Sequence, residues 1–444
     1  MTLPPPRPLL WAVALIAVHV FCIPAAAAPA LSDADETFLN DLQRRAFLYF
    51  WENGDPLTGL VLDRAGADGG PSAAARSRNV ASIAATGFGL TSLCIAERRG
   101  WVGRDRAYER ALATVRFLAE EMPHHRGFFY HFVDRHTGQR VWNCELSSID
   151  TALLMAGVLT VRQHYRGTEV ERLATGVYER VEWPWMLAGG TTLSMGWKPE
   201  GGPDGRFLDA RWDRFSEHPI LYLLALGSKT HPLPAEAWRA WRREPVVTYA
   251  GRSFLQHPPL FVHQFPHAWF HFRGRRDFDG RDFWTNSVDA TMAHRQFCID
   301  LAKGGDAKLS HFGPDLWGIT SSDSAAGYVG WGGPPATGNL DGTVVPCAAA
   351  GSLPFAPAEC LRALRHMREK HGERIWKHYG FVDAFNPHTG WVAPDVIGID
   401  QGITLLMAEN CRSGWVWECF GRNEEVERGW ERAGFTKRAN GEDR

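Results

Sequence analysis

Four acidic residues stand close to the start of apolar stretches, where carboxyl groups can carry out acid–base chemistry. Glu145 and Asp150 lie in the string WNCELSSIDTALLMAG. Glu217 precedes the apolar part of WDRFSEHPILYLLALG, and Asp400 lies in PDVIGIDQGITLLMAEN. If these groups share one cavity, a protonated carboxyl can assist a leaving oxygen while an ionised one activates water. Burial and helix N-termini can separate their pKa values as this chemistry requires.

Each acid also has a purely structural interpretation. Ser147 followed three positions later by Asp150 matches a capping box at a helix N-terminus. Glu217 fits a first-turn acid that the helix dipole favours, and Asp400 fits a capping role. Glu145 precedes its helix in an aromatic and amide setting, where capping explains it less well.

The stretches that look helical fall into two alternating kinds. Helices of the first kind have one apolar face and one charged face, and we expect them at residues 35–51, 104–121, 169–181, 235–243, 357–370 and 423–432. Helices of the second kind are apolar nearly all round, and we expect them at residues 80–95, 148–161, 219–226, 290–301 and 403–407.

Helices that are apolar on every side must be covered by others, so we expect an inner ring inside an outer ring, an all-α toroid. An α-solenoid would alternate similarly, but no fixed-period repeat supports one. In a toroid the inner helices run parallel, so one end would collect Glu145, Asp150, Glu217 and Asp400. Long ordered loops rich in Gly, Pro and Trp are expected to cover that end, at residues 182–214, 251–283 and 310–355.

Aromatic side chains are abundant, with 19 Trp in the chain. Flat rings stack on the apolar faces of sugars, while polar side chains beside them bond the hydroxyls. At each position a Trp packed in the core is the alternative. The candidates for sugar contact are Trp142, Trp197, Trp212, Trp269, Trp331 and Trp391.

Composition indicates a globular protein, because 444 residues that are 45% hydrophobic and 22% charged leave ample material for a core. The net charge of -2 and the scattered Lys and Arg support neither a nucleic-acid partner nor binding to a membrane surface. The histidines form no HExxH or similar pattern, so we expect no cofactor and no catalytic metal, with a structural Ca²⁺ left open.

The N-terminus has the features of a secretory signal, because Arg7 precedes an apolar stretch at residues 9–22 that ends in small residues. An uncleaved anchor is the alternative. The seven cysteines beyond Cys22 show no CxxC spacing, so we expect mostly small buried side chains, with one or two disulfides left open. We expect a signal peptide at residues 1–28, one domain at residues 31–436 and a polar tail at residues 437–444.

Several long strings, found in order across residues 35–435, resemble the glucoamylase-like domain of glycoside hydrolase family 144. They are FLNDLQRRAFLYFWE, SIAATGFGL, WNCELSSIDTALLMAG, FVHQFPHAWFHFRG, DGTVVPCAAAGSLPF and YGFVDAFNP. The resemblance implies an (α/α)6 barrel and a periplasmic or extracellular location. It also implies endo-acting, inverting hydrolysis of β-1,2-glucan to sophorose and short sophoro-oligosaccharides.

Carried over to this sequence, the resemblance implies that Glu217 is the general acid and that Glu145 or Asp150 is on the basic side. Inversion would place the working carboxyl groups about 6.5–9.5 Å apart, or use a relay through a substrate hydroxyl. The expected polar contacts to substrate are Arg64, His131, Asp134, Asn143, Gln264, His267, Asp323 and Asp400. At each of them a structural hydrogen bond is the alternative.

Two other classes of function compete with this hypothesis. A polysaccharide lyase on the same toroid would need a Tyr or His base and a cation, which Tyr130, His131 and Arg64 could supply. A glycan-binding protein that has lost catalysis would bind sugar without releasing new reducing ends. For the hydrolase we expect a monomer that acts on a β-glucan polysaccharide or oligosaccharide.

Overall fold

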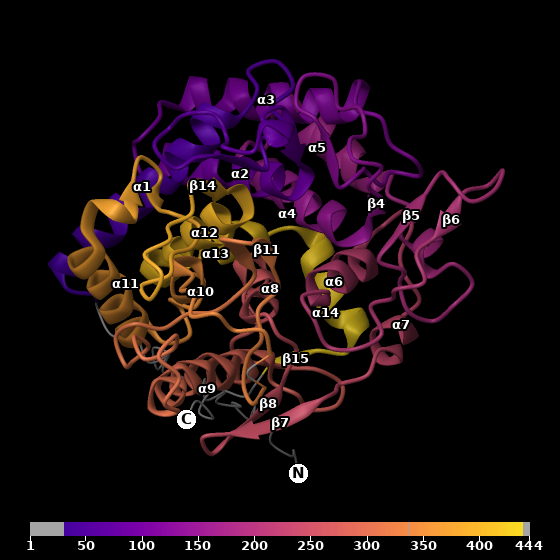
Figure 1. Cartoon of the computed structure of the whole chain (residues 1–444). Helices are drawn as coiled ribbons and strands as arrows, with labels where there is room; N and C mark the ends of the chain where they lie inside the picture. The colour runs from indigo at the N-terminus through magenta and orange to yellow at the C-terminus, as the bar shows by residue number, and fades with distance from the viewer. Residues whose placement is uncertain (1–30, 337, 438–444) are drawn as a thin grey trace, which may run out of the picture.

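Six helices with little exposed surface form an inner ring in the computed structural model, which describes residues 31–336 and 338–437. They are α2 (Ile83–Arg98), α4 (Ser148–His164), α6 (Pro219–Gly227), α8 (Phe265–Trp269), α10 (Pro346–Ala350) and α12 (Gly398–Ser413). Each follows a helix with an exposed side: α1 (Asp33–Asn53), α3 (Arg104–Glu120), α5 (Glu169–Glu179), α7 (Glu236–Ala240), α9 (Phe283–Lys303) and α11 (Pro357–His371). This alternation makes an (α/α)6 toroid and confirms the expected fold class (Figure 1).

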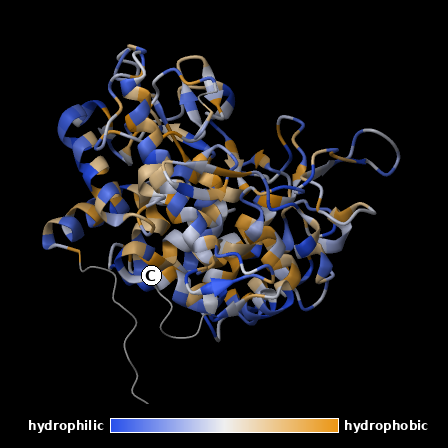
Figure 2. Ribbon diagram, turned by 90° about the horizontal axis from the view of Figure 1, so that it is seen from below, coloured by the Kyte–Doolittle hydropathy of each residue, from blue (hydrophilic) through white to orange (hydrophobic). Residues whose placement is uncertain are grey.

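The inner ring is tight because glycines let neighbouring helices touch. A Cβ at Gly87 of α2 would lie 2.3 Å from the Leu153 carbonyl oxygen, and one at Gly157 of α4 would lie 2.1 Å from the Gly87 oxygen. Side chains at these two positions would push α2 and α4 apart. Hydrophobic residues gather toward the middle of the molecule, and hydrophilic ones dominate its periphery (Figure 2).

Two inner helices lie where the sequence predicted loops, and one predicted inner helix belongs to the outer ring. Helices α8 and α10 have five residues each and a proline in the first turn, so they are too short to show a helical period. The stretch at residues 290–301 lies in α9, where Arg295, Gln296 and Asp300 are only half-buried.

Helices α13 (Trp415–Gly421) and α14 (Glu424–Ala433) follow α12 and complete the wall of the toroid. Helix α14 matches the one-faced helix predicted at residues 423–432. It crosses α6 at glycines, since a Cβ at Gly227 would lie 2.0 Å from the Glu425 oxygen and one at Gly429 2.4 Å from the Leu223 oxygen. In Figure 1 the C-terminal helix α14 lies beside α6.

Short antiparallel strands and single turns of 3-10 helix shape the loops that join the helices. The paired strands are β1 (Arg64–Gly66) with β14 (Asp395–Ile397), β2 (Val80–Ser82) with β3 (Phe132–Asp134), β4 (Leu146–Ser147) with β5 (Gly196–Lys198) and β6 (Arg206–Phe207), β7 (Val246–Tyr249) with β8 (Arg252–Leu255), β9 (Arg275–Arg276) with β15 (Thr436–Lys437), β10 (Ser322–Ser324) with β11 (Gly327–Val329), and β12 (Trp376–Lys377) with β13 (Gly380–Phe381). The 3-10 turns are η1 (Ala75–Ser77), η2 (Trp183–Leu187), η3 (Leu260–His263) and η4 (Gly372–Arg374). Strands β2, β4 and β14 end where α2, α4 and α12 begin, so they fix those helix starts.

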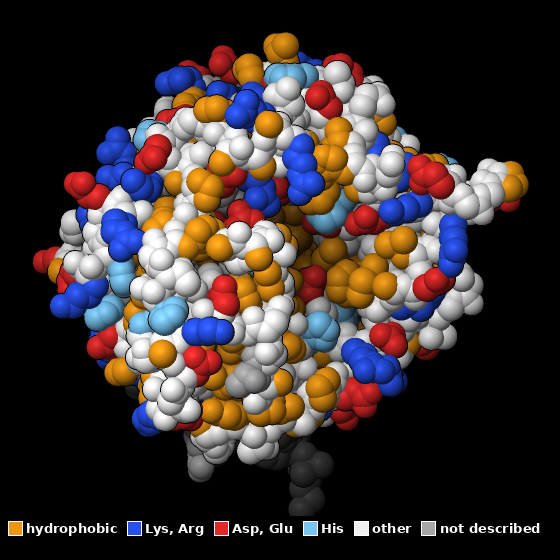
Figure 3. Space-filling view, in the orientation of Figure 1, with side chains coloured by type: hydrophobic (Ala, Val, Ile, Leu, Met, Phe, Trp, Pro, Cys, Tyr) orange, Lys and Arg blue, Asp and Glu red, His pale blue; other side chains and the backbone are white. Residues whose placement is uncertain are grey.

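The face of the toroid that is turned toward the viewer in Figure 1 has a hollow near its centre, as the space-filling view shows (Figure 3).

Both ends of the predicted domain organisation extend beyond the residues that the structure describes. The predicted signal peptide, Cys22 included, lies outside the described residues, as does nearly all of the predicted tail. Within the described part, no helix combines the length and apolar character needed to cross a membrane. The seven cysteines there are all free, and six of them are buried, as expected for small apolar side chains.

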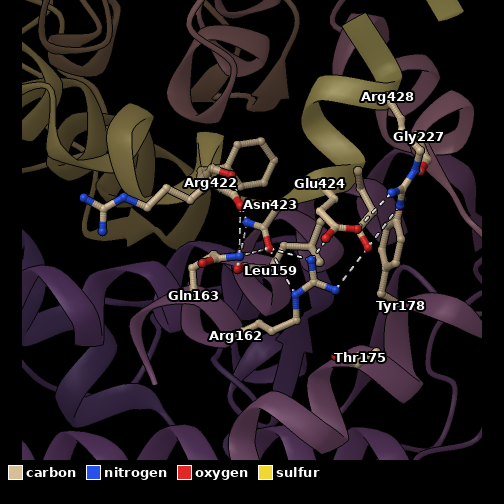
Figure 4. Close-up of polar contacts among 12 residues, drawn as sticks. Leu159, Arg162, Gln163, Thr175, Tyr178, Gly227, Arg422, Asn423, Glu424 and Arg428 are labelled. Carbon is tan, nitrogen blue, oxygen red and sulfur yellow. Dashed lines mark hydrogen bonds and ion pairs between the residues drawn. The ribbon is translucent and has the colours of Figure 1, made fainter. Parts of the chain in front are cut away.

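A buried ionic network attaches the C-terminal helices to the inner ring. Arg162 at the end of α4 donates through Nε to the Asn423 side-chain oxygen at 3.0 Å and through Nη1 to Glu425 Oε1 at 3.2 Å (Figure 4). Burial opposes ionisation of Glu425, but Arg162 outweighs it and lowers the pKa of that carboxyl. The network therefore holds two opposite charges away from water.

Replacing Arg162 with Met is expected to destabilise the protein by about 3 kcal/mol, because the Glu425 charge is left buried without its main partner. The free energy of unfolding from urea titration, followed by circular dichroism, measures the effect. Arg422→Met is the matched control, since the Arg422 and Glu418 side chains are 63% and 61% exposed and their pair contributes less than ~1 kcal/mol. Equal losses in the two variants would contradict this role of the network.

Candidate active site

One cavity of about 640 Å³ lies where the inner helices begin. Its lining includes Ser82 before α2, Asp150 in the first turn of α4, Glu217 before α6, Phe265 at the start of α8, and Ile399 in the first turn of α12. Acidic and histidine side chains are visible inside the hollow of Figure 3. The structure thus brings Asp150 and Glu217 to one cavity, as expected from parallel inner helices.

Asp150 is fixed by the start of its helix. Ser147 is the N-cap residue, and its hydroxyl accepts the Asp150 amide at 3.2 Å and donates to Asp150 Oδ2 at 2.5 Å. Ser147 therefore caps α4, but the predicted capping box is incomplete, because the Ser147 amide donates to the Phe129 carbonyl and the Asp150 carboxylate accepts from the Ser147 hydroxyl instead. The same side chain also lines the cavity, so capping and a role toward a ligand are compatible.

His131 lies between two carboxylates. Its Nδ1 is 3.0 Å from Glu145 Oε1, and its Nε2 forms an ion pair with Asp150 Oδ1 at 3.6 Å. Burial opposes a charged imidazole, but Asp150 and Glu145 outweigh it and raise the pKa of His131 to about 9. Burial also opposes ionisation of Glu145, yet its contact with His131 lowers the pKa of that carboxyl. A positive imidazolium therefore separates two negative groups at neutral pH.

Glu217 has the opposite electrostatic character. Burial raises its pKa, the Ser216 hydroxyl bonded to Oε2 partly offsets this, and the charge of Asp150 raises it further. The cavity therefore contains one carboxyl biased toward its protonated form. The same cavity is lined by Asp150, a carboxyl group that is paired with the His131 imidazole. An acid and a base need such a difference in surroundings.

Arg64 joins two loops across the cavity. Its Nε donates to Asp63 Oδ2 at 3.1 Å, and its Nη1 donates to Asp323 Oδ1 and Oδ2 at 3.1 and 2.9 Å. Arg64 follows α1, whereas Asp323 lies in the β10–β11 hairpin between α9 and α10. All three side chains line the cavity, so they form a charged wall made by segments far apart in the sequence.

Aromatic side chains with exposed surface lie around the cavity. Trp142 is 46% exposed and Tyr328 is 54% exposed, and both line it together with Trp391. Trp142 and Asn143 have left-handed backbone conformations, with φ of 57° and 51°, which are costly for residues with a Cβ. Such strain persists where the surrounding structure imposes it, here to present an indole at the cavity.

Several predicted contact residues do not line this cavity, because their polar atoms are used in packing. The Gln264 amide donates to the Ala348 carbonyl and the Ser352 hydroxyl, and His267 contacts Ser287. The indoles of four Trp donate instead to protein oxygens: Trp197 to Asp204, Trp212 to Ser148, Trp269 to Thr91 and Trp331 to Ser322. These six side chains thus make the structural hydrogen bonds that were the alternative interpretation.

Three further predicted residues are also placed away from the cavity lining. Asp134 accepts hydrogen bonds from the His136 and Thr137 amides and so holds a turn. Asn143 is exposed beside the cavity-lining Trp142. Asp400 is 7% exposed and lies behind the cavity wall. Glu145 does not line the cavity either, but it reaches it through His131.

Sequence reasoning missed several lining residues. Asp63 lines the cavity and directly precedes Arg64, which was predicted as a substrate contact. Its position beside that cation was the sequence signal that could have identified it. Asp395 lies in the quoted string PDVIGID, five residues before Asp400. Tyr328 gave no signal, because only the β10–β11 hairpin places it opposite Asp323.

Comparisons with known proteins agree with this geometry. A family model described as Glycoamylase, "Putative glucoamylase", matches residues 209–424. The exo β-1,2-glucooligosaccharide sophorohydrolase (non-reducing end) of Parabacteroides distasonis is 26% identical over 439 residues, a match that covers 89% of this chain. The chain spans only 57% of the length of that relative.

Solved structures match the fold over nearly the whole chain. An endo-β-1,2-glucanase from Chitinophaga pinensis, in complex with sophorotriose and glucose, has a TM-score of 0.83 and 28% identity, covering 92% of this chain and 99% of that one. A structure from Bacteroides fragilis described as a "putative glucoamylase" has a TM-score of 0.82 and 28% identity, covering 94% of this chain and all of that one.

These matches confirm the resemblance to glycoside hydrolase family 144 seen in the sequence strings. In sequence and fold this chain is similar to glucoamylase-like glycoside hydrolases.

Proposed function

We propose that this protein hydrolyses β-1,2-glucan, acting within the chain and with inversion to release sophorose and short sophoro-oligosaccharides. The observation that carries the proposal is that Asp150 and Glu217, from separate inner helices, line one cavity in electrostatic environments suited to a base and an acid. The linkage is supported by the names of the relatives from P. distasonis and C. pinensis.

In this mechanism Glu217 is the general acid. Its buried carboxyl keeps a proton to higher pH than an ordinary glutamate, so it can protonate the glycosidic oxygen as the bond from that oxygen to the anomeric carbon breaks. Water then forms the new bond to the anomeric carbon from the opposite face of the sugar, which inverts its configuration.

Asp150 is the better candidate for the basic side. It lines the cavity, whereas Glu145 lies behind His131 and does not. The attacking water gives its proton to Asp150, directly or through a substrate hydroxyl. Glu145 then has a supporting role, because its charge keeps His131 positive and His131 holds Asp150 in place.

The remaining cavity residues suit a sugar ligand. Trp142, Tyr328 and Trp391 offer aromatic faces on which pyranose rings can stack. Arg64 and Asp323 offer charged groups that can bond the hydroxyls. The lyase alternative is disfavoured, because a His131 imidazole with a pKa of about 9 is protonated at neutral pH and Tyr130 does not line the cavity.

The setting of the enzyme is part of the proposal. We propose cleavage of a signal peptide at residues 1–28, a catalytic domain at residues 31–436 with a polar tail, and a monomer in the periplasm or outside the cell. The apolar stretch at residues 9–22 followed by alanines supports export.

Incubation of the purified mature chain with linear β-1,2-glucan and a panel of other glucans tests the substrate. We expect sophorose and short oligosaccharides from β-1,2-glucan alone. Proton NMR taken early in the reaction should show α-anomers, because inversion of a β-linkage produces them. Products from another glucan only, or β-anomers, would refute this assignment.

Glu217→Gln is expected to lose about 10²–10⁴-fold in kcat with a modest change in KM, because the amide cannot protonate the leaving oxygen while its contacts to bound sugar remain. Steady-state kinetics on β-1,2-gluco-oligosaccharides measure both constants. Glu424→Gln is the matched control, since that side chain is 86% exposed on α14 and should leave both constants unchanged. An unchanged kcat in Glu217→Gln would remove Glu217 from the mechanism.

Asp150→Asn and Glu145→Gln should separate the two carboxylates. Asp150→Asn is expected to lose about 10²–10⁴-fold in kcat. Glu145→Gln should lose less, but the pKa of His131 should fall from about 9. Because the charged imidazole exists only below that pKa, the alkaline limb of the pH profile of kcat/KM should move about one unit lower.

This comparison has a clear contrary outcome. If Glu145→Gln loses as much kcat as Asp150→Asn and its alkaline limb stays in place, Glu145 is the base. Circular dichroism of both variants verifies that the fold is retained.

A further inference from the structure

The β10–β11 hairpin forms part of the cavity wall. Asp323, Ser324, Gly327 and Tyr328 all line the cavity, and Asp323 pairs with Tyr328 across the hairpin. The turn of the hairpin is exposed. A two-stranded hairpin has little stability of its own, so its position over the cavity depends on contacts with the rest of the molecule.

The hairpin is held from two sides. On the cavity side, Arg64 binds both oxygens of Asp323. On the far side, the backbone amide of Asp323 donates to Asp383 Oδ2 at 2.7 Å. Asp383 is 2% exposed and does not line the cavity, so it cannot touch a ligand there.

Asp383 also contacts a second segment of the wall. Its backbone amide donates to the Asp395 carbonyl at 3.3 Å. The Asp395 carboxylate accepts from the Ser72 hydroxyl at 2.6 Å and from the Ala73 amide at 2.9 Å, and Asp395 itself lines the cavity. One buried aspartate therefore connects the hairpin to β14 and, through it, to the loop that follows β1.

Behind the wall, Asp383 has a second carboxyl as its partner. Asp400 of α12, Asp383 and Cys347 of α10 line one small space, and burial together with the charge of Asp400 raises the pKa of Asp383. Gln401 and Thr404 complete a space of about 10 Å³, which has room for about one water molecule. Ionising two neighbouring buried carboxyl groups together is costly, so the protonated form of one of them is favoured.

We infer that Asp383 is a positioning residue that, with Asp400 as its partner, holds the β10–β11 hairpin and thereby sets the Arg64–Asp323 wall of the active site. The inference deepens the proposed function in that the wall is taken to bind sugar. The hydrogen bond by which Asp383 positions the hairpin does not depend on which substrate the enzyme takes.

Protonation of the Asp383–Asp400 pair makes the attachment of the β10–β11 hairpin sensitive to pH. Burial raises the pKa of Asp400 to about 6 and that of Asp383 well above its ordinary value, and the nearby acids Asp323 and Asp63 add to the shift at Asp400. A raised pKa means that the stabilising proton is present at low pH and is lost as pH rises. Loss of this proton leaves two adjacent negative charges, which should weaken the attachment of the hairpin.

Hydrogen exchange of the amides at residues 322–329, measured by mass spectrometry on the full chain, tests the inference. Asp383→Ala removes the acceptor, so these amides should exchange about tenfold faster than in the wild type. Asp383→Asn keeps an acceptor oxygen and should restore most of the protection. Asp289→Ala, which breaks a peripheral pair with Arg252, is the control and should leave the hairpin unchanged.

Kinetics give a second readout. Because the wall is assigned to binding and Asp383 does not touch the reacting atoms, Asp383→Ala should raise KM by about tenfold with a smaller change in kcat, and Asp383→Asn should recover KM. In Asp400→Asn only one carboxyl group of the pair remains to ionise. The loss of protection of the hairpin amides expected for the wild type as pH rises, measured relative to the intrinsic exchange rate at each pH, should therefore be absent in this variant.

Unchanged exchange of residues 322–329 in Asp383→Ala would overturn the inference, whatever the activity. If Asp383→Ala fails to fold, Asp400→Asn decides, and an unaltered pH dependence of hairpin exchange would overturn it. If the wild type does not cleave β-1,2-glucan but the exchange results follow expectation, the positioning role stands and the proposed substrate is wrong.

Discussion

Inner helices of an (α/α)6 toroid run parallel, so their first residues meet in a small space at one end. Partial positive charge at each helix N-terminus favours acidic side chains there. Crowding several acids into one cavity is costly unless cations balance them or protons neutralise them. The chain uses both means. His131 separates Glu145 from Asp150, Arg64 separates Asp63 from Asp323, and burial keeps Glu217 biased toward its neutral form.

That arrangement gives Asp150 and Glu217 different electrostatic surroundings in one cavity. Asp150 pairs with the His131 imidazole, whereas Glu217 forms no ion pair within the described residues and desolvation raises the pKa of its carboxyl. The difference follows from where each residue stands relative to its helix. Asp150 lies inside the first turn of α4, while Glu217 precedes α6 and is covered by neighbouring segments. In the proposed mechanism the roles of acid and base therefore follow from local surroundings and not from residue type.

Much of this could be predicted from the sequence, because it depends on local patterns. Apolar periodicity identified α2, α4, α6 and α14. The expectation of parallel inner helices placed Asp150 and Glu217 at the same end of the toroid. Helices α8 and α10 could not be found, since five residues do not complete two helical turns. Misplacing α8 in a loop also made His267 and Trp269 look like surface contacts, although both are core residues.

Contacts between segments that are distant in the sequence could not be predicted for a different reason. Arg64 and Asp323 are 259 positions apart, and neither has a local feature that names its partner. Asp383 lies in a string that contributed to the family resemblance, yet nothing in that string showed that its carboxylate would receive the Asp323 amide. Such pairings depend on how the loops cross the toroid face, which local periodicity does not encode.

A crystal structure of Glu217→Gln with a bound β-1,2-linked gluco-oligosaccharide would test the central claim most directly. The account predicts a sugar chain in the cavity, with a glycosidic oxygen within hydrogen-bonding reach of residue 217. It also predicts a water on the opposite face of the neighbouring sugar, in contact with Asp150 or linked to it by one hydroxyl. A sugar bound elsewhere, or oriented so that Asp150 and residue 217 flank no glycosidic bond, would contradict it.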